Sequence, residues 1–573
     1  MSSPHVSNVE LDVEGLGKIS GLCFDGQTCQ YYGIPFATVP GRFRRAKPAA
    51  APWPENKWDG TKLGSFPRQP PRDFYPIPNP QRPWVENPVQ SSTECLNLNI
   101  SVPTPPAESA GKAEYPVMVF YHGGAFVYAA GNAAIYDGRK LAEISKQLHG
   151  IPTIIITPNF RLGAFGFLAS KEIREYNQEH GEDGVGNYGL WDQVEALRWI
   201  QKHISAFGGD PKKVTLFGQS AGGVSVNVHM LRNEPLFSSA IIQSGLLPLC
   251  GVMSVDQYQV VYDKLLKVLE IPESLPPRER LQKLLEVDET QLTMAMIPVG
   301  VIPVLTYSPC DDHYLIGDRA IPTYSQYSDF HPPDWCQRVI IGDVANECMI
   351  WNKTYREHDA EEFISRIKSF LKDDTKAQKF FDLYDIKPGM DRTETFYKIE
   401  KFTTDGLYTA VDWLALRSHP QMYAYHFDVP SPFDNEWNGL AHHSLDNVYI
   451  WGLLKHLLPP HQQKVSETMT ECWLRFANGQ DPWERFDKSG KIMIFEDDKC
   501  VMKTVQEDAA RGYEKWEEIE KAGLLDDFQF LCDDLCMRRR EMTDPSVEPQ
   551  ALKVQDLSTL GIKTKSQLFG AGI

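Results

Sequence analysis

The chain has 573 residues, of which 42% are hydrophobic and 23% are charged, a balance typical of globular proteins with a large buried core. Its formal net charge of −18 argues against a protein that binds nucleic acid or an anionic membrane surface. A membrane-spanning helix is not expected either, because no apolar run approaches the ~18 residues that such a helix requires.

The N-terminal residues and the cysteines bear on the cellular compartment. Residues 1–17 contain neither the cationic segment nor the apolar segment of a signal peptide. The eleven cysteines are dispersed and odd in number, which favours reduced thiols over a framework of disulfide bonds. We therefore expect a cytoplasmic protein.

The N-terminal region is predicted to contain short strands and one long loop. Residues 17–37 hold β-prone runs separated by glycine and proline, a pattern typical of a β-meander. Residues 66–92 are rich in proline, arginine and asparagine and lack periodicity, which indicates a surface loop. Phe74, Tyr75 and Trp84 in this loop could cap a pocket, but we favour the interpretation that they pin the loop to the surface.

From residue 96 onward, predicted strands and helices alternate. Apolar or alternating runs predict the strands, and apolar stripes at helical spacing predict the helices. This order is typical of an α/β protein with a large, mostly parallel, doubly wound sheet and helices on both faces. The predicted strands are 96–102, 117–121, 152–158, 214–217, 240–245, 339–342, 421–428 and 491–495, and the predicted helical segments are 191–204, 224–231, 255–298, 359–418 and 461–478.

The predicted elements form one continuous pattern. No internal repeat, low-complexity block or linker divides it, so we expect a single domain over residues 1–541. The periodicity is lost from about residue 542 onward. Residues 542–573 are therefore expected to form an extended or poorly ordered C-terminal tail.

A G-x-S-x-G motif at residues 218–222 directly follows the predicted strand 214–217. A serine on a sharp turn from strand to helix exposes its hydroxyl group, and the flanking glycines remove side chains that would clash in so tight a turn. The following helix points its N-terminal amides and partial positive charge at an oxyanion formed beside Ser220. The motif favours a nucleophilic serine, and the alternative is a plain turn of small residues.

A second glycine-rich turn, at residues 122–126, follows the predicted strand 117–121. Such a turn frees backbone N–H groups, which is what an oxyanion hole requires. The alternative is an ordinary turn at the end of a strand.

Seven short segments together match the pattern of one family in the same order along the chain. They are GIPFA at 33–37, CLNLN at 95–99, YHGGAF at 121–126, NFRLG at 159–163, GNYGLWDQ at 186–193, FGGDP at 207–211 and GQSAG at 218–222. With these motifs the chain resembles the type-B carboxylesterase/lipase family, the cholinesterase-like branch of the α/β-hydrolases. The resemblance covers nearly the whole chain and implies an α/β-hydrolase fold.

The resemblance implies a catalytic triad with Ser220 as nucleophile, Glu347 as acid and a histidine of the 442–443 pair as base. Serine, acid and histidine then follow the chain order expected for this fold. The resemblance also implies a serine near the acid, which is Ser244. The oxyanion donors that it implies are the backbone N–H groups of Gly124, Ala125 and Ala221.

The choice between the two histidines depends on the register of the family pattern. The family carries an acidic residue three positions and a glycine nine positions after the base, and from His443 these are Asp446 and Gly452. Gly439 fits the register of His442 better. We predict His443 as the base, and His442 remains the alternative.

Two departures from the family pattern affect the interpretation. Phe66 stands where the family has the disulfide partner of Cys95, so we expect Cys95 to be a free thiol. Gln219 stands beside the serine where many relatives carry glutamate, which removes a negative charge and weakens the case for a cationic choline ester.

The resemblance therefore implies a carboxylic ester hydrolase that forms an acyl-enzyme on a small-molecule ester, with no metal or organic cofactor. One alternative is an acyltransferase, or an esterase that forms or opens lactones, since both use the same acyl-enzyme. Another is a non-catalytic, cholinesterase-like binding protein, a class that usually lacks the serine present here. The sequence defines neither the natural ester nor the oligomeric state.

Overall fold

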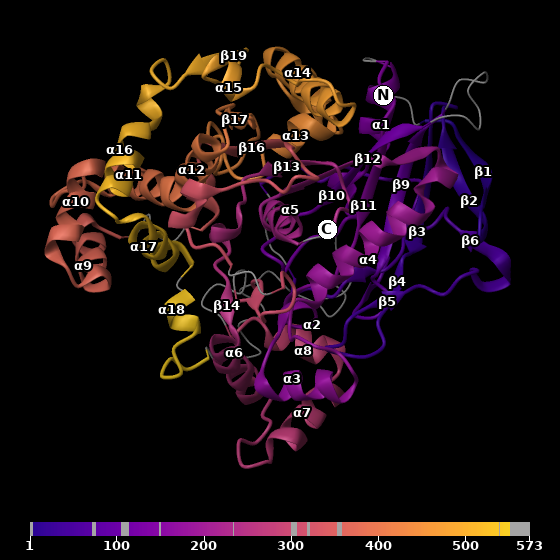
Figure 1. The fold of residues 1–573 in the computed structure, drawn as a ribbon, viewed down its shortest axis with the longest axis horizontal. Helices are drawn as coiled ribbons and strands as arrows, with labels where there is room; N and C mark the ends of the chain where they lie inside the picture. Colours follow the sequence, from indigo (N-terminus) through magenta and orange to yellow (C-terminus); the bar gives the residue numbers. More distant parts are fainter. Residues whose placement is uncertain are drawn as a thin grey trace.

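The computed structural model describes residues 4–71, 76–86, 88–104, 114–147, 150–232, 234–299, 306–317, 321–351, 358–537 and 539–549. Within these residues, thirteen strands form one large sheet (Figure 1). In order across the sheet they are β1 (Val6–Val13), β2 (Gly17–Phe24), β3 (Thr28–Pro35), β9 (Asn97–Pro103), β11 (Ile154–Pro158), β10 (Tyr115–Tyr121), β12 (Gly209–Gln219), β13 (Ser239–Gln243), β16 (Arg338–Val344), β17 (Tyr423–Phe427), β18 (Lys491–Phe495) and β19 (Cys500–Thr504), with β6 (Lys57–Asp59) beside β2.

The central strands of this sheet are parallel. Every neighbouring pair from β11 to β18 runs in the same direction. The pairs that flank this region, β11 with β9 and β18 with β19, are antiparallel. The predicted fold class, a mostly parallel, doubly wound α/β-hydrolase sheet, is confirmed.

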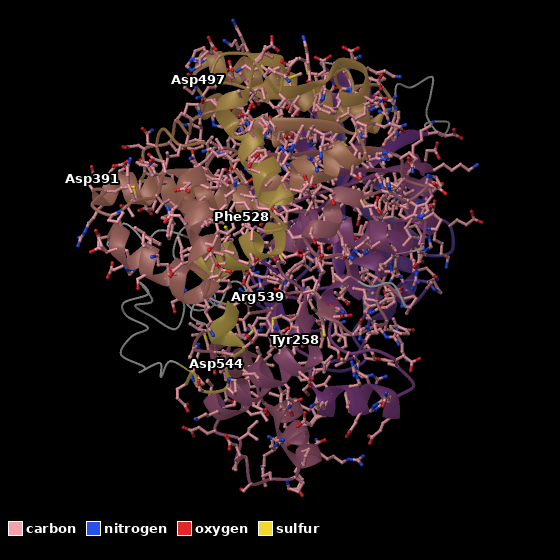
Figure 2. The ribbon with its side chains drawn as sticks, turned by 60° about the vertical axis from the view of Figure 1, so that its left-hand side comes forward. Tyr258, Asp391, Asp497, Phe528, Arg539 and Asp544 are labelled. Atoms are coloured by element: carbon pink, nitrogen blue, oxygen red, sulfur yellow. The ribbon has the colours of Figure 1, made fainter. Side chains whose placement is uncertain are left out.

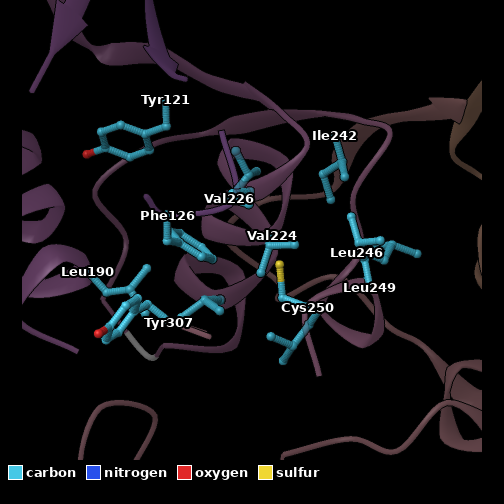
Figure 3. Close-up of a cluster of buried hydrophobic side chains, with 14 of the residues drawn as sticks. Tyr121, Phe126, Leu190, Val224, Val226, Ile242, Leu246, Leu249, Cys250 and Tyr307 are labelled. Atoms are coloured by element: carbon cyan, nitrogen blue, oxygen red, sulfur yellow. The ribbon is translucent and has the colours of Figure 1, made fainter. Parts of the chain in front are cut away.

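Both faces of the sheet are buried, as the alternation of side chains along β10 illustrates. Val117, Val119 and Tyr121 belong to one core cluster, whereas Met118 and Phe120 belong to the other. Helices α4 (Tyr188–His203), α5 (Ala221–Leu231) and α12 (Ala410–Ser418) pack in the first cluster, and α1 (Arg139–Gln147), α13 (Asp446–Trp451) and α14 (Pro460–Ala477) pack in the second. Figure 3 shows part of the first cluster, where side chains of α4, α5 and β10 lie together.

The remaining helices extend the molecule beyond the sheet. In Figure 1 one group lies on the left, α9 (Ala360–Leu371), α10 (Asp374–Tyr384), α11 (Arg392–Thr404), α16 (Tyr513–Lys521) and α17 (Leu525–Met537), and a second lies at the bottom, α3 (Lys171–Glu179), α6 (Val255–Val268), α7 (Pro277–Glu286) and α8 (Glu289–Ala295). Shorter elements are α2 (Gly163–Phe167), α15 (Phe486–Ser489), α18 (Arg539–Met542) and the strand pairs β4 (Ala37–Thr38) with β5 (Lys47–Pro48), β7 (Phe66–Pro67) with β8 (Gln90–Ser91) and β14 (Met253–Ser254) with β15 (Cys310–Asp311).

Most predicted elements are present, with shifted ends. The strand predicted over 214–217 begins earlier, at Gly209, and the helix after it begins at Ala221. The strand predicted to reach residue 245 ends at Gln243, because the backbone of Ser244 turns to a φ of 50°. The sequence analysis did not identify β1 or β19, which lie at the two edges of the sheet.

The C-terminal part of the described chain packs against α6. Arg539 of α18 donates to the hydroxyl group of Ser308 at 2.8 Å, and the carbonyl oxygen of Ser308 accepts the hydroxyl group of Tyr258. Figure 2 shows Arg539 and Tyr258 in this region, above Asp544. Of the expected tail, residues 550–573 lie outside the described residues.

Trp84 of the predicted surface loop packs on the N-terminal strands. Its ring lies 5.3 Å from the ring of Phe24, and its indole nitrogen donates to the hydroxyl group of Tyr32 at 3.3 Å. These contacts agree with the interpretation that Trp84 pins the loop. Phe74 and Tyr75 lie outside the described residues.

Two further findings concern helices and cysteines. None of the described helices is long and apolar enough to cross a lipid bilayer. None of the eleven cysteines forms a disulfide bond, and Cys95 is a buried thiol.

Candidate active site

Ser220 occupies the turn between the end of β12 and the start of α5. Its backbone has φ 58° and ψ −126°, a strained conformation for a residue with a Cβ atom. The backbone N–H of Ser220 donates to the carbonyl oxygen of Gln243 at 2.8 Å, which holds the turn against β13. A Cβ atom at Gly222 would lie 1.8 Å from the carbonyl oxygen of Tyr121, so this position accepts only glycine.

The glycine-rich turn after β10 packs directly on Ser220. A Cβ atom at Gly123 would lie 2.9 Å from the Cβ atom of Ser220. Gly124 and Ala125 follow with φ of 101° and 54°, and the carbonyl oxygen of Gly124 accepts the N–H groups of Val127 and Tyr128. The predicted oxyanion donors Gly124 and Ala125 therefore follow directly after the residue that packs on Ser220. The third predicted donor, Ala221, is the first residue of α5.

Glu347 lies in the turn that follows β16 and is fully buried. Its Oε1 accepts the backbone N–H of Val344 at 2.9 Å. Burial raises the pKa of the Glu347 carboxyl group well above its usual value, the hydrogen bond from Val344 lowers it, and the carboxylates of Asp343 and Asp446 raise it further. A positively charged group beside Glu347 would therefore strongly stabilise its ionised carboxylate.

Ser244, the predicted serine near the acid, lies beside the Glu347 carboxyl group and lowers its pKa. Its hydroxyl group nevertheless does not reach hydrogen-bonding geometry with any described residue. The hydroxyl group of Ser244 is therefore close enough to lower the pKa of the Glu347 carboxyl group, although the contact is looser than a well-formed hydrogen bond.

The two adjacent histidines have different environments. Nδ1 of His443 forms a very short hydrogen bond with Oε2 of Glu347, whereas Nδ1 of His442 contacts the carbonyl oxygen of His443 at 3.0 Å. Burial lowers the pKa of His442 to about 4. A backbone hydrogen bond from Asn346 to Ala441, 2.9 Å long, joins the segment that carries the acid to the segment that carries the histidines. The structure thus brings His443 to Glu347.

The outer nitrogen of His443 contacts Gln219, a residue that the sequence analysis considered only for its charge. The side-chain nitrogen of Gln219 lies 3.0 Å from Nε2 of His443. An amide nitrogen only donates, so Nε2 is the accepting nitrogen and Nδ1 carries the proton toward Glu347. This is the tautomer that a general base requires.

Asp446, the acidic residue used to predict the register of the base, is the first residue of α13. Its carboxylate accepts the side chains of Gln243 at 2.8 Å and Tyr425 at 3.1 Å. Because Gln243 belongs to β13 and Tyr425 to β17, these bonds attach the helix after His443 to the sheet.

A doubly wound sheet with a serine at the sharp turn between β12 and α5 defines the class of protein as an α/β-hydrolase. Residues 7–521 match the model of the carboxylesterase family, and the chain therefore belongs to this family. It is a carboxylic ester hydrolase.

Several relatives match most of the chain. Lipase 3 of Yarrowia lipolytica is 27% identical over 80% of this chain and 86% of its own length. Para-nitrobenzyl esterase of Bacillus subtilis is 29% identical over 81% of this chain and 89% of its own length. A solved PNB esterase structure has a TM-score of 0.67 and 25% identity, covering 88% of this chain and 99% of that chain.

Proposed function

We propose that the protein hydrolyses carboxylic esters through an acyl-enzyme on Ser220, with His443 as general base and Glu347 as its carboxylate partner. The observation that carries the proposal is the hydrogen bond between His443 Nδ1 and Glu347, since it fixes the tautomer whose Nε2 can accept a proton. The strained turn of Ser220 supports the assignment of the nucleophile.

The first step is attack by the Ser220 hydroxyl oxygen on the ester carbonyl carbon. His443 Nε2 takes the hydroxyl proton, so the contact with the Gln219 amide must give way to a contact with Ser220 in this step. The imidazolium that forms is stabilised by the Glu347 carboxylate, whose burial strengthens the attraction.

The tetrahedral oxyanion is bound by the backbone N–H groups of Gly124, Ala125 and Ala221. Each such donor contributes roughly 3 kcal/mol to stabilisation of the transition state. Collapse of the intermediate expels the alcohol, which receives the proton from His443. A water molecule then repeats the sequence on the acyl-enzyme and releases the carboxylic acid and the free serine.

The relatives suggest uncharged esters as substrates. They include a lipase and a para-nitrobenzyl esterase. A mouse cholinesterase is also similar, with 36% identity over 40% of this chain and 36% of its own length. The neutral Gln219 amide offers a cationic alcohol no charge partner beside the serine, which favours neutral ester groups.

A panel of esters of varied acyl length tests the proposal. The expected result is hydrolysis by the wild type, loss in Ser220→Ala, and labelling of Ser220 by a fluorophosphonate. Ser328→Ala, which changes an exposed serine outside the site, is the matched control and should retain activity. Retained activity in Ser220→Ala, or labelling of another residue, would contradict the proposal. Adding an alcohol to the assay shows whether the acyl group goes to water or to the alcohol.

A further inference from the structure

Glu400 is a buried carboxyl group next to the candidate site that the triad does not use. It lies in α11 and is only 2% exposed. Its Oε1 accepts the hydroxyl group of Thr404 at 2.8 Å, and its Oε2 accepts the side-chain amide of Asn346 at 3.4 Å. Asn346 immediately precedes Glu347, so Glu400 contacts the segment that carries the predicted acid.

A second path connects Glu400 to the other side of Glu347. The backbone N–H of Cys348 donates to the hydroxyl oxygen of Thr404 at 3.1 Å, while the same hydroxyl group donates to Glu400. One carboxyl group is therefore attached to the residues before and after Glu347. Hydrogen bonds linked in this way strengthen one another.

Asn346 also connects this network to the predicted base. Its backbone N–H donates to Ala441 at 2.9 Å, and the segments of Asn346 and His442 form a short parallel bridge. A displacement of Asn346 would consequently move Glu347 and His443 relative to one another.

We propose that Glu400 is a positioning residue, which holds Glu347 in place for its hydrogen bond with His443 through Asn346 and Thr404. The inference rests on the proposed function of Glu347 and His443. Because misplacement of reacting groups by about 1 Å can slow a reaction about 100-fold, a carboxyl group that fixes both sides of the acid is expected to affect turnover more than substrate binding.

The groups around Glu400 define which substitutions are informative. Lys401 and Asp405 lie nearby in the same helical run, and Cys348 faces Glu400 from the turn of the acid. Glutamine keeps the length of the side chain and one accepting oxygen without the charge. Glu400→Gln should therefore preserve the contact with Thr404, whereas Glu400→Ala removes both contacts.

Steady-state kinetics of Glu400→Ala and Glu400→Gln test the proposal. We expect kcat to fall about 10- to 100-fold in Glu400→Ala with KM changed less than about twofold, and part of the loss to be recovered in Glu400→Gln, which keeps the contact with Thr404 but not the one with Asn346. Glu394→Ala, which changes an exposed glutamate of the same helix, is the matched control and should behave as the wild type. Thr404→Val, which removes one path at similar volume, should show an intermediate loss and replaces Glu400→Ala if that variant does not fold.

A spectroscopic measurement makes the test independent of turnover. The proton between His443 and Glu347 should give a low-field proton NMR signal that is absent in His443→Ala, and this signal should shift or broaden in Glu400→Ala. An unchanged signal and an unchanged kcat in folded Glu400→Ala would overturn the proposal. Equal damage in Glu400→Gln and Glu400→Ala, with kcat falling only as the melting temperature falls, would also overturn it. If the wild type has no Ser220-dependent activity, the proposed function fails, and the NMR signal alone then decides the role of Glu400.

Discussion

The two halves of the candidate active site are held in place by different means. The nucleophile half consists of the turns at residues 122–126 and 218–222, each continuous in sequence and shaped by glycines that allow close backbone contact. The acid–base half joins Glu347 and His443, which are 96 positions apart. Its geometry depends on hydrogen bonds with the backbone of β16 and with side chains of β13 and α11. A local turn tolerates changes elsewhere in the molecule, whereas a network of distant side chains is sensitive to each of its members.

Removal of the nucleophile is expected to have the largest effect. Ser220→Ala should lower kcat by about 10⁴- to 10⁶-fold, since no other group at the turn can form the acyl-enzyme. The thermal melting temperature should not fall, because alanine keeps the Cβ atom that packs in the turn and removes only the hydroxyl group. Stopped-flow or steady-state hydrolysis of an activated ester measures the loss. A decrease of less than about 10-fold would place the nucleophile elsewhere.

Replacing each of the two adjacent histidines separately tests which one acts in the acid–base half of the site. His443→Ala should lower single-turnover acylation by about 10⁴-fold, because the general base and the partner of Glu347 are lost together. His442→Ala should cause a much smaller loss, since the His442 ring contacts the carbonyl oxygen of His443 and the ring of Trp437, and Glu347 forms its hydrogen bond with His443 instead. The reverse order of effects would assign the base to His442 and leave the nucleophile half unchanged.

The network around the acid should also make stability dependent on pH. Burial raises the pKa of Glu400 to about 7, against an unfolded value of about 4.5. The protonated Glu400 carboxyl group therefore contributes to the free energy of unfolding fully below about pH 4.5, and this contribution is lost as pH rises through about 7. Glu400→Gln, which does not ionise, should gain stability relative to the wild type between pH 5 and pH 8, by up to about 3 kcal/mol. Urea unfolding at both pH values measures the difference, and a difference independent of pH would contradict it.

The contact between Gln219 and His443 joins the two halves and gives the smallest predicted effect. Gln219→Glu would place a carboxylate beside Nε2 and should raise the pKa of His443 by about one unit. Because the base must be neutral, the acid limb of kcat/KM should move to higher pH by the same amount. Gln219→Met removes the hydrogen bond without adding charge and should leave the limb in place. Equal shifts in both variants would show that charge is not the cause.

The sequence by itself determined the alternation of strands and helices, the single turn that carries Ser220, and the glycine turn at 122–126. These features are local, because the period of the apolar residues and the small residues at a turn depend on neighbours within one or two turns of chain. The edge strands β1 and β19 were missed because their pattern is weak without the partner strands that bury them. The pinning role of Trp84 was predicted from its place in the loop, whereas its partners, Phe24 of β2 and Tyr32 of β3, are known only from the structure.

Only the tertiary structure decided which histidine faces Glu347. The spacing of Asp446 and Gly452 favoured His443, and that of Gly439 favoured His442, so the local pattern was ambiguous. The contacts of Gln219 and Glu400 were invisible in the sequence for the same reason. Gln219 meets His443 across 224 positions, and Glu400 meets Asn346 across 54. Such contacts arise when the crossovers of a parallel sheet bring the ends of separate strands together, and no local sequence pattern records them.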